Sequence, residues 1–251
     1  MRGKLGNWME TSLLHLSAVL IGVSKAGFGG GTGVLVTPLL TLVLPPKEVV
    51  ALMLPLLLAT DILSLGYYWR RWDTRNVVAL MPGALLGILL GGRLLGMLSD
   101  LALKRIIGVL ACLFAGLQIL RERLPSAVEG YQPRYWHGLG AGMVTGLSST
   151  LAHVGGVITS MFLLPQKLPN RTFVGTTTLL YFLINGSKMP VYLGLGLIDL
   201  PLLRRDLPLL PTLALGVLLG IWLNRRVSAT LFSRIVLAFV LLTGIKLLLL
   251  P

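Results

Sequence analysis

The chain has 251 residues, of which 55% are apolar and only 12% are charged, and its formal net charge is +13. An ordinary soluble domain has about 25% charged residues and cannot bury so much apolar surface. The composition therefore excludes a soluble enzyme and a disordered chain. The basic residues lie in short clusters between apolar runs, as interfacial anchors do in membrane proteins, which excludes a nucleic-acid-binding module.

Long apolar runs follow one another along the chain, separated mostly by charged or proline-bearing connections. A transmembrane helix needs about 20 residues, with a range of roughly 17–25, and several runs reach that length. The runs are apolar on every side, whereas the strands of a transmembrane barrel alternate apolar with polar residues. We therefore predict an all-α polytopic membrane protein with the lipid bilayer as a partner. The runs lie at about 11–24, 33–44, 49–69, 76–92, 106–120, 137–150, 154–165, 172–198, 207–224 and 235–250.

Two pairs of neighbouring runs are interrupted by glycine. The first and second runs are each too short to cross, yet together too long for one straight crossing, and the same holds for the sixth and seventh. Residues 27–33 (GFGGGTG) separate the first pair, and residues 153–156 (HVGG) separate the second. We expect helices broken at these places in mid-membrane, which are tolerated only where the loose backbone faces protein or water.

The second half of the chain repeats the first at a nearly constant offset. An offset of 124 carries Gly22 to Gly146, and after a five-residue insertion an offset of 129 carries Gly87 to Gly216. Leucine-rich composition alone does not explain such identities in the same order. We predict two homologous repeats of about four hydrophobic segments each, with a glycine-broken helix at the start of each repeat.

These repeats set the expected domain boundaries. Residues 1–123 form the first transmembrane repeat, 124–133 the polar linker, and 134–251 the second transmembrane repeat. Re-entrant hairpins at the glycine clusters would leave three crossings per half and inverted repeats. Single broken crossings would give four per half and parallel repeats. The distribution of Lys and Arg over the connections does not choose between them.

Polar residues in the run 172–198 recur at helical spacing. Thr178, Tyr181, Asn185, Lys188 and Tyr192 are three or four positions apart, so they share one helical face. Ionisable groups inside a membrane cost roughly 2.5–3.5 kcal/mol each on insertion scales, and they usually face a cavity. We expect this stripe to line a transport path.

A matching stripe in the first half contains Asp61, Ser64 and Tyr68, and the offset of 124 pairs Asp61 with Asn185. The structural alternative is an ion pair of Asp61 with Lys188 or with Lys25 that holds helices together.

The glycine clusters beside these charges indicate an anion site. A break in mid-membrane exposes backbone N–H groups at the start of the following half-helix, where the helix dipole adds positive potential. No Gly-Lys-Ser/Thr follows the first cluster, so it is not a nucleotide-binding loop. Close helix packing is the alternative role for the glycines. The expected substrate-binding residues are Lys25, Gly29, Gly30, Gly31, Gly155, Gly156, Asn185, Lys188 and Tyr192.

Asp61 and His153 are the expected proton- or ion-coupling residues, because both lie deep in the chain's apolar segments. A histidine exchanges a proton near neutral pH when its environment leaves its pKa near 6.5. The alternative for His153 is a neutral ring hydrogen-bonded within the bundle. The chain contains no H-E-x-x-H, no G-x-S-x-G and no paired carboxylates in one segment. We therefore expect no enzyme activity, no cofactor and no metal site.

Glycines at four-residue spacing mark helix-packing faces. Gly83, Gly87 and Gly91 form one such run, and Gly216 and Gly220 form another. These faces favour packing within the subunit, and a homodimer interface is the alternative.

Four stretches spread over both halves also carry a family resemblance. They are 24–31 (SKAGFGGG), 59–61 with 68–73 (YWRRWD), 80–87 (LMPGALLG), and 173–177 (FVGTT) continuing through Asn185, Lys188 and Tyr192. Together they resemble the sulfite exporter TauE/SafE family of membrane transporters, over nearly the whole chain. The second cluster, 153–156, departs from the first because it lacks three consecutive glycines, so the two half-sites are not equivalent.

The resemblance implies a multi-pass transporter in the bacterial cell (inner) membrane. Its implied substrates are small sulfur-containing or organic anions such as sulfite, sulfonates or thiosulfate. Discontinuous-helix transporters place their site between the repeats near the bilayer midplane, and we expect the same here, with ion coupling. A passive anion channel and a membrane scaffold without transport are the alternatives.

Overall fold

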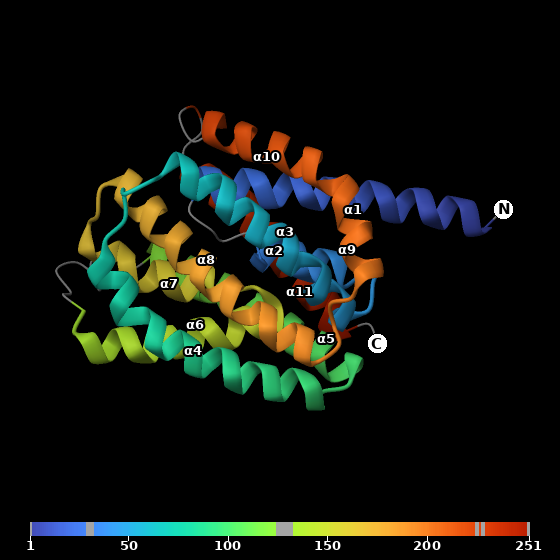
Figure 1. Cartoon of the computed structure of the whole chain (residues 1–251), viewed down its shortest axis with the longest axis horizontal. Coiled ribbons are helices and arrows are strands. Elements are labelled where there is room, and N and C mark those ends of the chain that lie inside the picture. The colour runs from blue at the N-terminus through green and yellow to red at the C-terminus, as the bar shows by residue number, and fades with distance from the viewer. Residues whose placement is uncertain (1, 29–32, 124–132, 224–225, 227–228, 250–251) are drawn as a thin grey trace.

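The computed structural model describes residues 2–28, 33–123, 133–223, 226 and 229–249. These parts of the chain are almost entirely helical and contain no strand, which confirms the all-α prediction. Figure 1 shows the helices packed side by side in one bundle. The elements are α1 (Arg2–Phe28), α2 (Gly33–Leu40), α3 (Pro46–Tyr67), α4 (Thr74–Met97), α5 (Asp100–Arg123), α6 (Tyr135–Ala152), α7 (Gly156–Leu163), the 3-10 turn η2 (Leu164–Gln166), α8 (Asn170–Gly194), α9 (Leu200–Asp206), the 3-10 turn η3 (Leu207–Leu209), α10 (Leu210–Leu223) and α11 (Ala229–Leu249).

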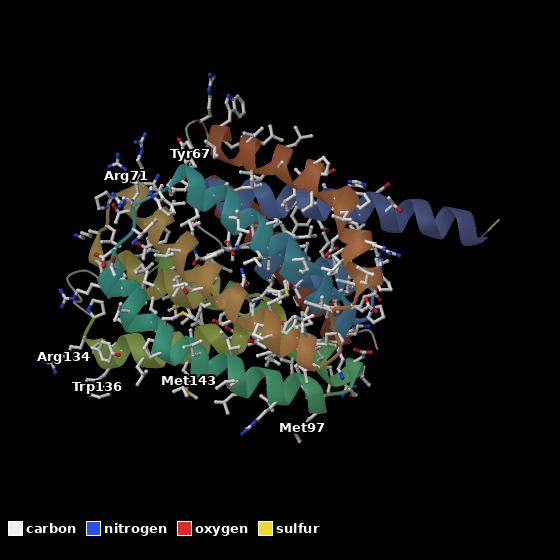
Figure 2. All side chains as sticks on the ribbon, viewed as in Figure 1. Tyr67, Arg71, Met97, Arg134, Trp136 and Met143 are labelled. Carbon is white, nitrogen blue, oxygen red and sulfur yellow. The ribbon has the colours of Figure 1, made fainter. Side chains whose placement is uncertain are left out.

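Four helical segments within the described ranges are long and apolar enough to cross a membrane. They are Pro46–Tyr67, Thr74–Met97, Asp100–Leu120 and Leu200–Leu223. The outer surface of the bundle carries apolar side chains: Met97 of α4 and Trp136 and Met143 of α6 lie exposed on it (Figure 2). An apolar outer surface suits lipid as the surrounding solvent.

Local sequence signals set several helix starts. Pro46 occupies the first position of α3, where its missing N–H is not needed. The Asp73 carboxylate accepts a hydrogen bond from the Asn76 N–H at the start of α4, and Asp199 does the same for Leu202 at the start of α9. These caps satisfy backbone donors that the first helical turn leaves without partners.

Helices α6 and α7 form a hairpin that turns inside the protein. The Oγ1 atoms of Thr145 in α6 and Thr159 in α7 are 3.4 Å apart. A straight helix would separate residues 14 positions apart by about 21 Å, so α7 must fold back along α6. The amides of Gln166, in η2, and Asn76, at the start of α4, exchange two hydrogen bonds of 2.8 and 2.9 Å. The second half therefore contains a re-entrant hairpin and not a single broken crossing.

Two hydrogen bonds mark the two ends of the bundle. At one end, the Lys47 N–H at the start of α3 donates to the Asp100 carboxylate at the start of α5, over 3.3 Å. At the other end, the Asp73 N–H before α4 donates to the Thr176 hydroxyl near the start of α8, over 2.8 Å. We name these the Lys47 end and the Asp73 end.

The glycine runs pack helices against each other within this chain. A Cβ atom on Gly87 of α4 would lie 2.1 Å from the Met143 carbonyl oxygen of α6, and one on Gly216 of α10 would lie 2.5 Å from the Val19 carbonyl oxygen of α1. In Figure 1, α1 and α10 lie together along one edge of the bundle, and α4 and α6 lie together along the opposite edge. Only glycine allows backbones to approach this closely.

The same two offsets that relate the sequence halves relate these contacts. Val19 and Met143 are 124 positions apart, while Gly87 and Gly216 are 129 apart. In the α1–α10 contact, the first half provides Val19 and the second half provides Gly216. In the α4–α6 contact, the second half provides Met143, which corresponds to Val19, and the first half provides Gly87, which corresponds to Gly216. In both pairs the contacts advance together along the two helices, so the paired helices run parallel.

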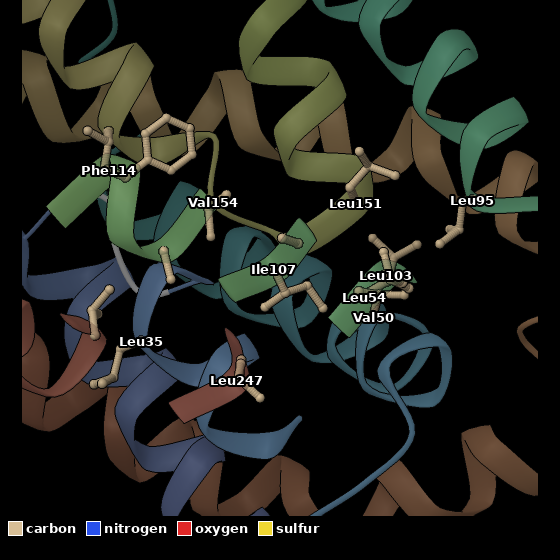
Figure 3. Close-up of a cluster of buried hydrophobic side chains, with 14 of the residues drawn as sticks. Leu35, Val50, Leu54, Leu95, Leu103, Ile107, Phe114, Leu151, Val154 and Leu247 are labelled. Carbon is tan, nitrogen blue, oxygen red and sulfur yellow. The ribbon is translucent and has the colours of Figure 1, made fainter. Parts of the chain in front are cut away.

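A large apolar cluster fills the interior between α2, α3, α5, α6 and α7 (Figure 3). Val50 and Leu54 of α3 meet Ile107 of α5, Leu151 of α6 and Val154 of the hairpin turn there. This packing fixes the turn of the α6–α7 hairpin against α3. It therefore determines where the polar groups of that turn point.

Candidate functional site

Five polar or charged side chains lie buried together in the middle of the bundle. They come from four different parts of the fold, namely α1, α3, α8 and the turn between α6 and α7, and each is less than 9% exposed. The five residues are Lys25, Asp61, His153, Asn185 and Lys188. All five were predicted as site residues from their spacing or their neighbourhood in the sequence.

Asp61 is the centre of the first part of this cluster. Its carboxylate forms an ion pair with the Lys25 ammonium and also accepts a hydrogen bond of 2.6 Å from the Asn185 amide. Lys25 donates a further hydrogen bond to the Leu57 carbonyl over 3.3 Å, and its ammonium lies 5.6 Å from the centre of the Tyr181 ring. The structure thus forms the Asp61–Lys25 ion pair, one of the two pairs considered from the sequence.

Lys188 is the centre of the second part, and its side chain is 0% exposed. Its ammonium lies 3.2 Å from the Ser149 carbonyl oxygen, 3.1 Å from the Ser149 hydroxyl and 2.9 Å from Nδ1 of His153. All of these partners are acceptors without a negative charge. No ion pair found among the described residues joins Lys188 to a carboxylate.

His153 ends α6 and turns the chain toward α7. Its backbone has a φ of 55°, in the left-handed region that residues other than glycine and asparagine seldom adopt. Nε2 of its ring lies 2.9 Å from the Val50 carbonyl oxygen of α3, while Nδ1 faces Lys188. Because a carbonyl only accepts, Nε2 must carry a hydrogen.

Two tyrosines secure the ends of the half-helices. The Tyr192 hydroxyl donates to the Thr150 carbonyl of α6 over 2.6 Å, and the Tyr68 hydroxyl donates to the Ala26 carbonyl of α1 over 3.1 Å. The last carbonyls of a helix lack partners within it, so these hydroxyls satisfy groups that would otherwise be unpaired inside the protein. Tyr192 is therefore a partner of the hairpin backbone as well as a member of the predicted stripe.

The predicted glycines fall into two groups. Gly155 and Gly156 lie buried between His153 and the first turn of α7. A Cβ atom on Gly155 would lie 2.7 Å from the Thr145 carbonyl oxygen, so the turn requires glycine there. Gly29, Gly30 and Gly31 lie outside the residues that the structure describes.

Sequence reasoning missed Ser149 and the backbone carbonyls of Val50 and Leu57. The carbonyls carry no residue signature, because every residue has one. Ser149 did carry a signal: it lies 124 positions after Lys25, so the repeat offset already aligned it with a predicted site residue. The search for metal sites found no group of three His, Cys, Asp or Glu side chains among the described residues.

Comparison with known protein families identifies a match over nearly the whole chain. The family model described as sulfite exporter TauE/SafE matches residues 14–247. Neither a curated protein nor a solved structure matches the chain.

Proposed function

Because the chain belongs to the sulfite exporter TauE/SafE family, we propose that it transports a small sulfur-containing or organic anion of the sulfite, sulfonate and thiosulfate class. The family consists of membrane transporters, and the apolar helices make this chain a multi-pass membrane protein. The proposal places the protein in the bacterial inner membrane and makes its transport ion-coupled.

The observation that carries the proposal is that, among the described residues, no carboxylate is in direct contact with the buried Lys188 ammonium. Lys25 is neutralised by Asp61, whereas the fully buried Lys188 faces only neutral acceptors. A buried charge without a paired counter-charge is costly. Such charges inside membrane proteins usually serve a function. An anion would supply the missing counter-charge, so Lys188 is the residue we propose as its principal attractor.

The neighbouring groups would complete the site. Gly155 and Gly156 lie next to Lys188's partner His153, at the start of α7, where a half-helix directs N–H groups and positive potential toward an anion. We propose that these glycines bind the anion's oxygens, with Gly29, Gly30 and Gly31 playing the same role in the first half. Lys25, Asn185 and Tyr192 would form the remaining wall.

We further propose that the site lies between two inverted repeats, residues 1–123 and 134–251, joined by the linker 124–133. The hydrogen bond between Asp61 and Asn185 joins residues that are 124 positions apart, as expected for equivalent residues that meet at a two-fold axis. The exchanged glycine contacts support the same symmetry. Asp61 and His153 are the groups proposed to exchange the coupled ion.

Flux into proteoliposomes tests this function. The panel contains sulfite, thiosulfate, sulfoacetate, taurine and carboxylates, and saturable uptake of at least one anion is expected. Absence of any flux would favour a membrane scaffold, and flux that never accumulates anion against a gradient would favour a passive channel.

Lys188→Ala is expected to abolish this flux while the protein still reaches the membrane. Lys246→Ala is the matched control, because it removes the same charge from an exposed position near the end of α11. Its flux should remain near that of the wild type. Wild-type flux in Lys188→Ala would contradict the proposed site.

A further inference from the structure

The hydrogen bonds around Lys188 and His153 are all satisfied when Lys188 is an ammonium ion and the His153 ring is neutral. Lys188 has three N–H donors, and they face the Ser149 carbonyl, the Ser149 hydroxyl and Nδ1 of His153. Nε2 of His153 already donates to the Val50 carbonyl. With Lys188 as an ammonium ion, one hydrogen lies between Nζ and Nδ1, and the two side chains together carry one positive charge.

A second proton cannot be added to this arrangement. Protonating His153 at Nδ1 would turn its last acceptor into a donor that faces the Lys188 ammonium across 2.9 Å. The hydrogen bond would break, and two positive charges would be left adjacent in the interior. An anion inserted between them would accept from both groups and restore the charge of the site.

We propose that His153 and Lys188 bind one proton together with one monovalent anion, so that the loaded site carries the same charge as the empty one. This inference rests on the proposed anion transport. The proton comes from the aqueous phase that supplies the anion, and it is held on Nδ1 of His153. A divalent anion with one proton would change the site's charge, so it should be carried less well than a monovalent one.

The other charged groups near His153 do not alter this balance. Those that face it are Lys188 and Tyr192 of α8, Lys25 of α1 and, beyond Lys25, Asp61 of α3. Lys25 and Asp61 compensate each other as an ion pair. Helix α2 contains no titratable residue, and the α7 segment contains none either. In α4, Arg75 and Arg93 are exposed, and in α5 the charged groups with described side chains lie in its first two turns.

The test uses proteoliposomes and methanesulfonate, whose single charge does not change with pH. Uptake should be slower when the vesicle interior is more acidic than the outside. Anion should accumulate when the outside is more acidic than the interior. A membrane potential imposed at equal pH should have no effect on uptake. The apparent affinity should rise by up to tenfold for each unit that the pH falls, because proton and anion bind together. A response to the potential without a response to the pH gradient would overturn the inference.

His153→Gln is the decisive variant, because its amide can take the place of Nε2 as the donor to the Val50 carbonyl but takes no proton near neutral pH. For each variant, gradient-driven uptake is divided by the same variant's uptake at equal pH. This ratio should fall to one in His153→Gln and remain at the wild-type value in His15→Gln, whose ring forms a hydrogen bond with Thr212 of α10 instead of with the Lys188 group. His153→Asn gives a second test, since its amide oxygen takes the place of Nδ1 as an acceptor for Lys188 and asparagine tolerates the left-handed backbone found at this position.

The two proposals fail in different ways. If neither methanesulfonate nor any anion in the panel is carried, both are overturned. If methanesulfonate is carried and His153→Gln retains the full response to the pH gradient, only the shared loading of proton and anion is overturned. If only divalent anions are carried, the anion transport stands and the monovalent loading is wrong.

Discussion

At the scale of single residues, the site combines a compensated charge with an uncompensated one. Asp61 holds Lys25 through an ion pair and Asn185 through a hydrogen bond. Lys188 is held by the Ser149 backbone and by the His153 ring. The first group is therefore suited to holding α1, α3 and α8 together, and the second holds a buried ammonium without a carboxylate in direct contact.

Asp61→Asn should destabilise the protein strongly. Removing one partner of a buried ion pair leaves the other charge unpaired, at a cost of about 3–5 kcal/mol, and here Lys25 would be left. Thermal unfolding in detergent should show a lower midpoint. Adding Lys25→Met should recover much of the loss, because it removes the stranded charge.

Glu48→Gln is the matched control for this prediction. It breaks the ion pair of Glu48 with Arg205, whose side chains are about one-third exposed, and an exposed pair contributes roughly 0–1 kcal/mol. If Asp61→Asn shifts the midpoint no more than Glu48→Gln does, water must solvate Lys25, and the prediction is contradicted.

The sequence identified much of this cluster, for a physical reason. Charged residues in apolar runs are costly, so Asp61, Lys188 and Lys25 stood out, and helical spacing grouped Asn185 and Tyr192 with Lys188. Which lysine pairs with Asp61 depends on how α1 packs against α3, and no residue pattern contains that. The assignment of these residues to binding and coupling stays a prediction.

At the scale of elements, glycine faces determine which helices lie side by side. Gly83, Gly87 and Gly91 of α4 face α6, and Gly216 and Gly220 of α10 face α1. The spacing of these glycines predicted packing faces, but it did not name their partners. The partner of α4 follows from the α6–α7 hairpin, because a helix that ends inside the bundle needs a neighbour over its whole length.

Gly87→Ala should separate α4 from α6 and destabilise the protein. The added Cβ would lie 2.1 Å from the Met143 carbonyl oxygen, which is backbone and cannot rotate away. Overpacking of this kind costs typically about 1–3 kcal/mol. The measurement is the unfolding midpoint in detergent, together with the retention of monodisperse protein after heating.

Gly116→Ala is the opposite case within the same fold. Gly116 lies in α5, and a Cβ there meets nothing within 4 Å. Alanine is the better helix former by about 0.8–1 kcal/mol, so this variant should be as stable as the wild type or more so. Equal effects of the two substitutions would show that backbone contact is not what glycine provides at position 87.

At the scale of the whole molecule, the choice between inverted and parallel repeats was left open by the sequence. Hydrophobic periodicity predicts helices but not the direction in which each one crosses the membrane. The basic residues are spread too evenly over the connections to determine that direction. The contact between Thr145 and Thr159 shows that α6 and α7 form a re-entrant hairpin. It thereby determines the chain direction at the start of the second half. Three long helical segments then follow the hairpin, an odd number that reverses the direction of the chain.

Inverted repeats make a prediction about the two faces of the membrane. Arg71 follows α3 and Leu195 follows α8, and they are equivalent under the offset of 124. Arg71 lies near the Asp73 end of the bundle, whereas Leu195 lies at the Lys47 end, because α8 begins at the Asp73 end and crosses the bundle. Single cysteines at these two positions, in a Cys112→Ser background, should therefore react with a membrane-impermeant maleimide from opposite sides. A third single-cysteine variant, Arg134→Cys, should react from the same side as Arg71→Cys, since α6 begins beside the start of α4. Labelling of Arg71→Cys and Leu195→Cys from one side would establish parallel repeats and would place the equivalent half-helices on the same side of the bilayer.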